Sequence, residues 1–127
     1  MEKVKILVVD DESRMRKLVS DFLVKKNFVV LEAGDGEEAL DIFYKDKEIA
    51  LLILDVMMPK MSGWEVCREI RKTSKVPIIM LTAKSDESDE LMGFDLGGEE
   101  YSTTPFLPKK LVEGVEASLR RANKNGG

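Results

Sequence analysis

The chain has 127 residues, which fits one domain that buries about two-thirds of the surface exposed by its unfolded form. Its formal net charge of -4 argues against a surface that coats nucleic acid. Cys67 is the only cysteine and histidine is absent, which excludes intrachain disulfides, multi-cysteine zinc sites, Ser-His-Asp catalysis and a phosphohistidine on this chain. The single cysteine makes a reducing cytoplasm the expected location. Because no run of about 18 apolar residues occurs, we expect no membrane contact.

Short apolar runs predict the β-strands. Several are apolar enough to be buried on both faces, which is typical of a parallel sheet. The predicted strands are Val4–Val9, Phe28–Leu31, Leu51–Leu54, Pro77–Leu81 and a short fifth strand at Glu100–Thr103.

Segments with helical spacing lie between these strands. Ser13–Lys26 predicts an amphipathic helix with Ser13 as a candidate N-cap. Asp35 and Ser62 can cap the second and third helices, and Asp86–Leu96 predicts a fourth. Pro108 begins the last. The apolar face of the first helix is predicted to comprise Met15, Leu18, Val19, Phe22 and Leu23.

The alternation of strand and helix, repeated five times, predicts a doubly wound α/β domain. We expect this domain to span residues 1–122 and residues 123–127 to be a linker stub or tail. The sequence shows no second domain and no internal repeat.

Polar side chains follow three of the predicted strands. Asp10 and Asp11 follow the first strand, Asp55 the third and Thr82 the fourth. Ligands of doubly wound sheets bind beyond the carboxyl ends of the strands, so we expect these four residues at one edge. Three carboxylates this close repel one another and require a cation. An all-oxygen ligand set fits Mg²⁺, with Mn²⁺ as an alternative.

Helix caps and solvated loop acids offer a plainer interpretation of such residues. We favour it for Asp35, and Thr82 can likewise cap the fourth helix. It explains Asp10, Asp11 and Asp55 less well, because these acids end two different buried strands.

The segments ILVVDDE, LLILDVMMPKMSGWEV, PIIMLTA and YSTTPF resemble, in order and spacing, the receiver domain of bacterial two-component response regulators. The likeness is to receivers of the chemotaxis-regulator and winged-helix transcription-regulator types, and it covers nearly the whole chain. It implies a flavodoxin-like (βα)5 fold with a five-stranded parallel sheet of order 2-1-3-4-5. It also implies a phosphoacceptor signalling module that is not an enzyme beyond Mg²⁺-assisted self-phosphorylation and slow autodephosphorylation.

The resemblance also implies roles for individual residues. Asp55 would take a phosphoryl group from a sensor histidine kinase. Asp11 and Asp55 would hold Mg²⁺ directly with the backbone carbonyl of Met57, and Asp10 would assist. The resemblance places Thr82, Ala83 and Tyr101 at switch or phosphate-binding positions, and Pro59, Gly63 and Pro105 in loops that shape the site.

The match breaks at Thr104, which precedes Pro105 where the family carries a lysine. A threonine hydroxyl has no charge and cannot form the ion pair of that lysine. Three outcomes stay open. The chain binds Mg²⁺ and is phosphorylated but switches poorly, Lys60 or Lys84 supplies the cation, or the chain is an engineered or degenerate receiver that no longer signals.

The last helix departs from the pattern as well. Lys110, Gly114 and Glu116 stand where relatives with DNA-binding output domains carry an acid, an arginine and a lysine that pair across a dimer. We therefore expect a monomer or a weak dimer. Gly114 in mid-helix costs about 1 kcal/mol relative to alanine.

Two functions from different classes compete. The first is the phosphoacceptor module, whose fourth helix, fifth strand and fifth helix would meet an output domain or regulatory protein without direct nucleic-acid contact. The second is a pseudo-receiver that binds proteins without efficient phosphorylation. A haloacid-dehalogenase-like phosphatase is disfavoured because Met57 stands where that class carries a second aspartate.

Overall fold

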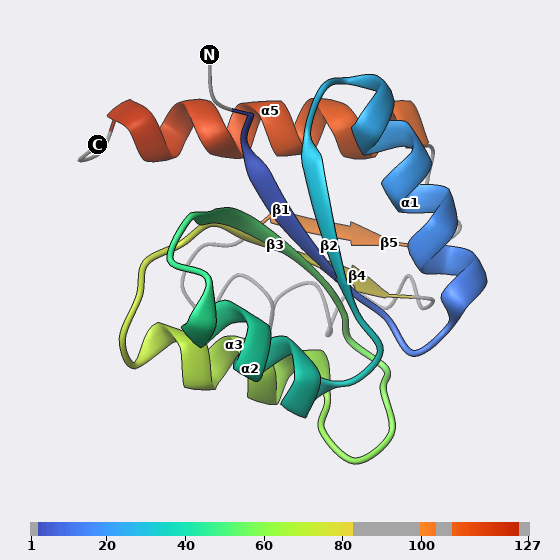
Figure 1. Ribbon diagram of the computed structural model, residues 1–127, viewed down its shortest axis with the longest axis vertical. Helices are drawn as coiled ribbons and strands as arrows, with labels where there is room; N and C mark the ends of the chain where they lie inside the picture. The colour runs from blue at the N-terminus through green and yellow to red at the C-terminus, as the bar shows by residue number, and fades with distance from the viewer. Residues whose placement is uncertain (1–2, 83–99, 104–107, 125–127) are drawn as a thin grey trace.

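The computed structural model describes residues 3–82, 100–103 and 108–124 (Figure 1). The strands are β1 Lys5–Val9, β2 Val29–Ala33, β3 Ile49–Asp55, β4 Ile78–Thr82 and β5 Glu100–Thr103. The helices are α1 Ser13–Lys25, α2 Gly36–Lys45, α3 Gly63–Arg71 and α5 Pro108–Lys124. The fourth helix predicted at residues 86–96 lies outside the described residues.

All strand pairs are parallel, and the strand order is β2-β1-β3-β4-β5. Helices cover both faces of this sheet, with α2 and α3 on one side and α1 and α5 on the other (Figure 1). The predicted doubly wound parallel α/β architecture is therefore confirmed. Among the described residues, no helix has the length and apolar character needed to cross a membrane.

Two apolar layers hold the sheet between its helices, because successive residues of a strand point to opposite faces. In β1, Leu7 and Val9 pack in the layer under α2 and α3, whereas Ile6 and Val8 pack in the layer under α1 and α5. The central strand β3 follows the same alternation with Leu52 and Leu54 against Leu51 and Ile53. Each such side chain contributes roughly 1.5–3 kcal/mol relative to exposure.

The helix caps agree with the sequence at two of three places. The Asp35 side chain accepts a hydrogen bond from the Glu38 amide at 2.8 Å, and Ser62 Oγ accepts one from the Glu65 amide at 3.3 Å. The prediction for Ser13 was wrong, because Glu12 is the N-cap residue and Ser13 is already helical. The Glu12 amide donates to Asp10 Oδ1 at 2.9 Å, and this turn starts the helix one residue earlier than predicted.

The strand ends also differ from the sequence prediction by one or two residues. Asp55 is the last residue of β3, where it pairs with Leu81, and Thr82 is the last residue of β4. Both residues were expected just after their strands. Hydrogen bonding to neighbouring strands decides where each strand ends, and a single apolar run does not show which strands will be its neighbours.

Two glycines occupy opposite environments. A Cβ on Gly63 would collide with the backbone carbonyl oxygen of Asp55, and it would lie 3.0 Å from Val56 Cα. Gly114 lies within α5, and no heavy atom would come within 4 Å of its Cβ. Close backbone packing therefore explains Gly63, whereas nothing in the structure explains Gly114.

We expect Gly114→Ala to raise the free energy of unfolding by about 1 kcal/mol, because alanine has the higher helix propensity and fits without contact. Gly63→Ala should lower it by about 1–3 kcal/mol, because the Asp55 backbone must move. Urea denaturation of the two variants beside the unchanged chain measures both effects. A stabilised Gly63→Ala or a destabilised Gly114→Ala would contradict the packing described here.

Candidate functional site

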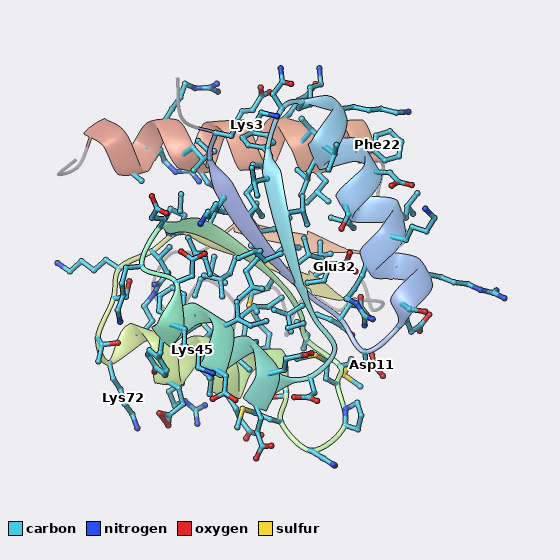
Figure 2. The ribbon with its side chains drawn as sticks, in the orientation of Figure 1. Lys3, Asp11, Phe22, Glu32, Lys45 and Lys72 are labelled. Atoms are coloured by element: carbon cyan, nitrogen blue, oxygen red, sulfur yellow. The ribbon has the colours of Figure 1, made fainter. Side chains whose placement is uncertain are left out.

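Three carboxylates meet at the carboxyl ends of two neighbouring strands. Asp10 and Asp11 follow β1, and Asp55 ends β3, which pairs with β1. One carboxylate oxygen from each of the three residues lies within 4.8 Å of the others. Figure 2 labels Asp11 in the loop between β1 and α1. The predicted convergence of these acids is therefore confirmed.

The three acids differ in exposure and in their hydrogen bonds. Asp10 is buried, Asp55 is partly buried and Asp11 is exposed. Asp10 Oδ1 accepts from the Glu12 amide at 2.9 Å, and Asp55 Oδ1 accepts from the Met57 amide at 3.1 Å. Each of these two carboxylates is thus held by the backbone two residues further on.

Burial of the Asp55 carboxyl, followed by the nearby charge of Asp10, raises the pKa of Asp55 from its ordinary value of 3.8 to about 7. The hydrogen bond from the Met57 amide opposes this rise. Burial also raises the pKa of Asp10, against the lowering effect of the Glu12 amide. The folded chain therefore holds negative charge at this edge at a cost in stability.

No lysine or arginine in the described part of the chain forms an ion pair with these three carboxylates. Carboxylate oxygens without histidine or cysteine suit hard divalent cations. The arrangement can therefore hold a metal ion whose charge would offset the mutual repulsion.

The loop after Asp55 is tied to its surroundings by backbone hydrogen bonds. The Val56 amide donates to the Leu81 carbonyl at 2.8 Å, and the Gly63 amide donates to the Val56 carbonyl at 3.0 Å. Between them the chain turns at Lys60, which is exposed and has a φ of 68°. Positive φ is uncommon for residues other than glycine and often marks a functional loop.

Other predicted residues are only partly within the described structure. The backbones of Thr82 and Tyr101 lie in β4 and β5, paired with Thr103 and Met80 respectively. Pro59 is exposed in the loop after Asp55. Ala83, Thr104, Pro105 and Lys84 lie outside the described residues, so their roles stay predictions.

The sequence did not predict the contact that Arg16 makes with the backbone of Asp10 at this site. Its Nη1 donates to the backbone carbonyl of Asp10 at 2.6 Å. The buried residues of α1 are Val19, Ser20 and Leu23, and Arg16 precedes them by one helical turn on the same face. The stripe predicted from the sequence included Leu18, which is instead 43% exposed. Extending the observed face by one turn would have pointed to Arg16.

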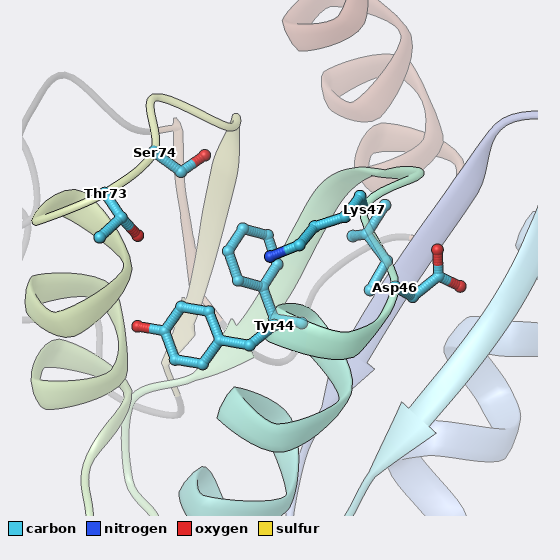
Figure 3. Close-up of a pocket in the computed structure, with 7 residues that line it drawn as sticks. Tyr44, Asp46, Lys47, Thr73 and Ser74 are labelled. Carbon is cyan, nitrogen blue, oxygen red and sulfur yellow. The ribbon is translucent and has the colours of Figure 1, made fainter.

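A separate pocket of about 240 Å³ lies at the other end of the sheet (Figure 3). It opens between the ends of α2 and α3 beside Ile49, which begins β3, whereas Asp55 ends it. The Lys47 ammonium lies 6.0 Å from the centre of the Tyr44 ring at this pocket. Because Ile49 and Asp55 lie at opposite ends of β3, this pocket is distinct from the acidic site.

Comparison with known proteins shows the family of the chain. The family model described as response regulator receiver domain matches residues 6–116. The chain therefore belongs to the response regulator receiver domains, and the resemblance noted in the sequence is confirmed.

Individual relatives agree with this assignment. The chain is 49% identical to a probable transcriptional regulator ycf27 of Porphyridium aerugineum over 98% of this chain and 51% of that protein. It is 44% identical to the transcriptional regulatory protein ResD of Bacillus subtilis over 96% of this chain and 50% of that protein. The chain thus spans about half the length of these curated relatives.

Solved structures confirm the flavodoxin-like α/β fold. A response regulator receiver domain protein from Clostridium thermocellum matches with a TM-score of 0.88 and 32% identity. That match covers 94% of this chain and 97% of the other.

The raised pKa of Asp55 predicts a pH-dependent stability. Between pH 3.8 and about 7 the folded chain keeps a proton that the unfolded chain has lost, so the free energy of unfolding falls as pH rises through this window. With metal chelated, Asp55→Asn should be the more stable protein at pH 8, by about 1–3 kcal/mol after allowance for solvent screening. This difference should narrow as the pH is lowered to 5.

Urea denaturation at several pH values measures the difference. Asp41→Asn, which removes an exposed carboxylate of α2, is the control for a general loss of negative charge. The same trend in both variants would show that Asp55 has no special cost.

Proposed function

We propose that this chain accepts a phosphoryl group on Asp55 from the phosphohistidine of a sensor histidine kinase, and so serves as the phosphoacceptor module of a two-component system. The observation that carries the proposal is the convergence of Asp10, Asp11 and Asp55, whose carboxylates form no ion pair with a lysine or arginine among the described residues. Membership of the receiver family supports it.

The chemistry requires a carboxylate that can act as a nucleophile. An oxygen of ionised Asp55 would form a bond to phosphorus while the bond between phosphorus and the kinase histidine breaks, and the imidazole would keep that electron pair. The product is an acyl phosphate on Asp55. Its partial exposure at the end of β3 makes the side chain accessible to a partner. Bound Mg²⁺ would supply positive charge for the phosphoryl oxygens and the carboxylates.

We propose Asp11 and Asp55 as direct ligands of Mg²⁺, with the backbone carbonyl of Met57, and Asp10 as an assisting group. Asp10 is buried, and its Oδ1 accepts a hydrogen bond from the Glu12 amide. Both features support an assisting role. Mn²⁺, which also accepts oxygen ligands, is the alternative ion.

The remaining site residues complete the proposal. Thr82 and Ala83 would contact the phosphoryl group, and the Tyr101 ring would turn inward when that group is present. Gly63 allows α3 to approach the Asp55 backbone, which supports its role in shaping the loop together with Pro59. Pro105 would shape the loop after β5. Beyond self-phosphorylation and slow autodephosphorylation, we propose no turnover.

Covalent phosphorylation tests the central claim. We expect acetyl phosphate with Mg²⁺ to add one phosphoryl group to the unchanged chain, as measured by intact-protein mass spectrometry. Asp55→Asn should show none, because its amide is not a carboxylate nucleophile. Asp35→Asn is the matched control, because asparagine also caps helices and should leave α2 and the reaction intact. Absence of modification in the unchanged chain would contradict the function.

We further propose that Thr104 impairs the switch that follows phosphorylation. Threonine is short and uncharged, so it cannot pair with the phosphoryl group as a lysine would. Of the two lysines that could supply the missing positive charge, Lys60 is within the described residues, and it is exposed in the loop after Asp55.

Thr104→Lys should therefore enlarge the change in hydrogen exchange that beryllofluoride with Mg²⁺ causes in the amides of β5. Thr104→Gln, which is long but neutral, separates length from charge and should respond as the unchanged chain does. An equally large response in all three proteins would exclude an effect of Thr104. No response in any of them would favour the alternative function, a pseudo-receiver that binds proteins.

The partner surface is proposed to comprise the fourth helix, β5 and α5, facing an output domain or regulatory protein. Relatives named as transcriptional regulators are about twice as long as this chain, which supports an output unit. In that arrangement residues 1–122 are the receiver, 123–127 a linker, and the receiver itself does not contact nucleic acid. Lys110, Gly114 and Glu116 support a monomer or weak dimer.

A further inference from the structure

Arg16 joins three segments of the chain beside the acidic site. It belongs to α1, its Nη1 donates to the Asp10 carbonyl at 2.6 Å, and its Nε donates to Glu32 Oε1 at 3.2 Å. Glu32 belongs to β2, and its position beside α1 is visible in Figure 2. The Arg16 side chain is only 20% exposed, so the guanidinium is held between the helix and the sheet.

The segment that Arg16 holds carries two of the three acids. The β1 ladder ends at Val9 and α1 begins at Ser13, so Asp10 and Asp11 lie outside both elements. The Asp10 amide donates to the Ala33 carbonyl at 3.2 Å. Arg16 binds the carbonyl of the same residue. The Asp10 backbone is therefore fixed on both sides, once by β2 and once by α1.

This restraint opposes a specific force. The carboxylates of Asp10, Asp11 and Asp55 repel one another, and the connection between β1 and α1 is the part that can yield to that repulsion. Glu32 orients the guanidinium by accepting from Nε, which leaves Nη1 directed at the Asp10 carbonyl. Groups that orient metal ligands in this way affect affinity without touching the ion.

We propose that Arg16, oriented by Glu32, is a positioning residue that holds Asp10 and Asp11 in the geometry required to bind a divalent cation with Asp55. This inference rests on the proposed function, because the cation is the one assigned to the phosphoacceptor site. Arg16 itself contacts neither the ion nor the phosphoryl group.

Positioning and simple electrostatics predict effects of opposite sign. Arg16 carries positive charge next to an acidic cluster, so its removal should favour a cation if only charge matters. A positioning role predicts weaker binding on removal. It also predicts weaker binding for Arg16→Lys, because a single ammonium keeps the charge but does not reproduce the planar fork that reaches the Asp10 carbonyl and Glu32 together.

The experiment is a titration of metal-free protein with MgCl₂, followed by Trp64 fluorescence and by isothermal calorimetry. We expect Arg16→Lys and Arg16→Gln each to raise the dissociation constant about tenfold, as changes to groups that orient ligands typically do. Arg14→Gln removes the same charge from an exposed position of α1 and should change the constant by less than about twofold. Circular dichroism and urea denaturation establish that each variant is folded.

The outcomes separate the two proposals. Unchanged or tighter binding by folded Arg16→Lys and Arg16→Gln would overturn the positioning role and leave the proposed function standing. Absence of Mg²⁺ binding by the unchanged chain would overturn both. Equal weakening by Arg14→Gln would overturn the specific positioning role of Arg16, because loss of an exposed arginine of α1 would then have the same effect.

Discussion

Repulsion among the carboxylates of Asp10, Asp11 and Asp55 is the interaction around which this structure is organised. The strand order places β1 beside β3, so acids distant in the sequence are brought within 4.8 Å. Burial of Asp10 and partial burial of Asp55 remove water that would otherwise screen their charges, and burial contributes most to the raised pKa of Asp55. The fold thus stores unfavourable electrostatic energy at one edge, in a form that binding of a cation can release.

The apolar layers on both faces of the sheet stabilise the fold against this repulsion. The valine, leucine and isoleucine side chains of β1 and β3 are almost entirely removed from water, and they pack against helices on either side. Their burial fixes the strands in register, which in turn fixes the acids at the strand ends. The stability of the core and the charge at its edge are therefore linked through the same two strands.

The sequence predicted the elements that depend on local signals. Buried strands gave continuous apolar runs, and Asp35 and Ser62 carried their capping function in their side chains. Features set by neighbouring segments were missed. The end of β3 at Asp55 depends on pairing with β4, and the start of α1 depends on the turn made by Asp10. Periodicity alone assigned Leu18 to the buried face, although it is largely exposed.

The lack of a side chain at Gly63 has a mechanical consequence. The first turn of α3 rests on the Asp55 backbone. The Val56 amide donates a hydrogen bond to Leu81 of β4, and the Val56 carbonyl accepts one from Gly63. Strand, loop and helix therefore form a stiff joint beneath Asp55, while Lys60 is exposed in the loop. A chemical label has room at the exposed Lys60 side chain, whereas even one methyl group at Gly63 would collide with the Asp55 backbone.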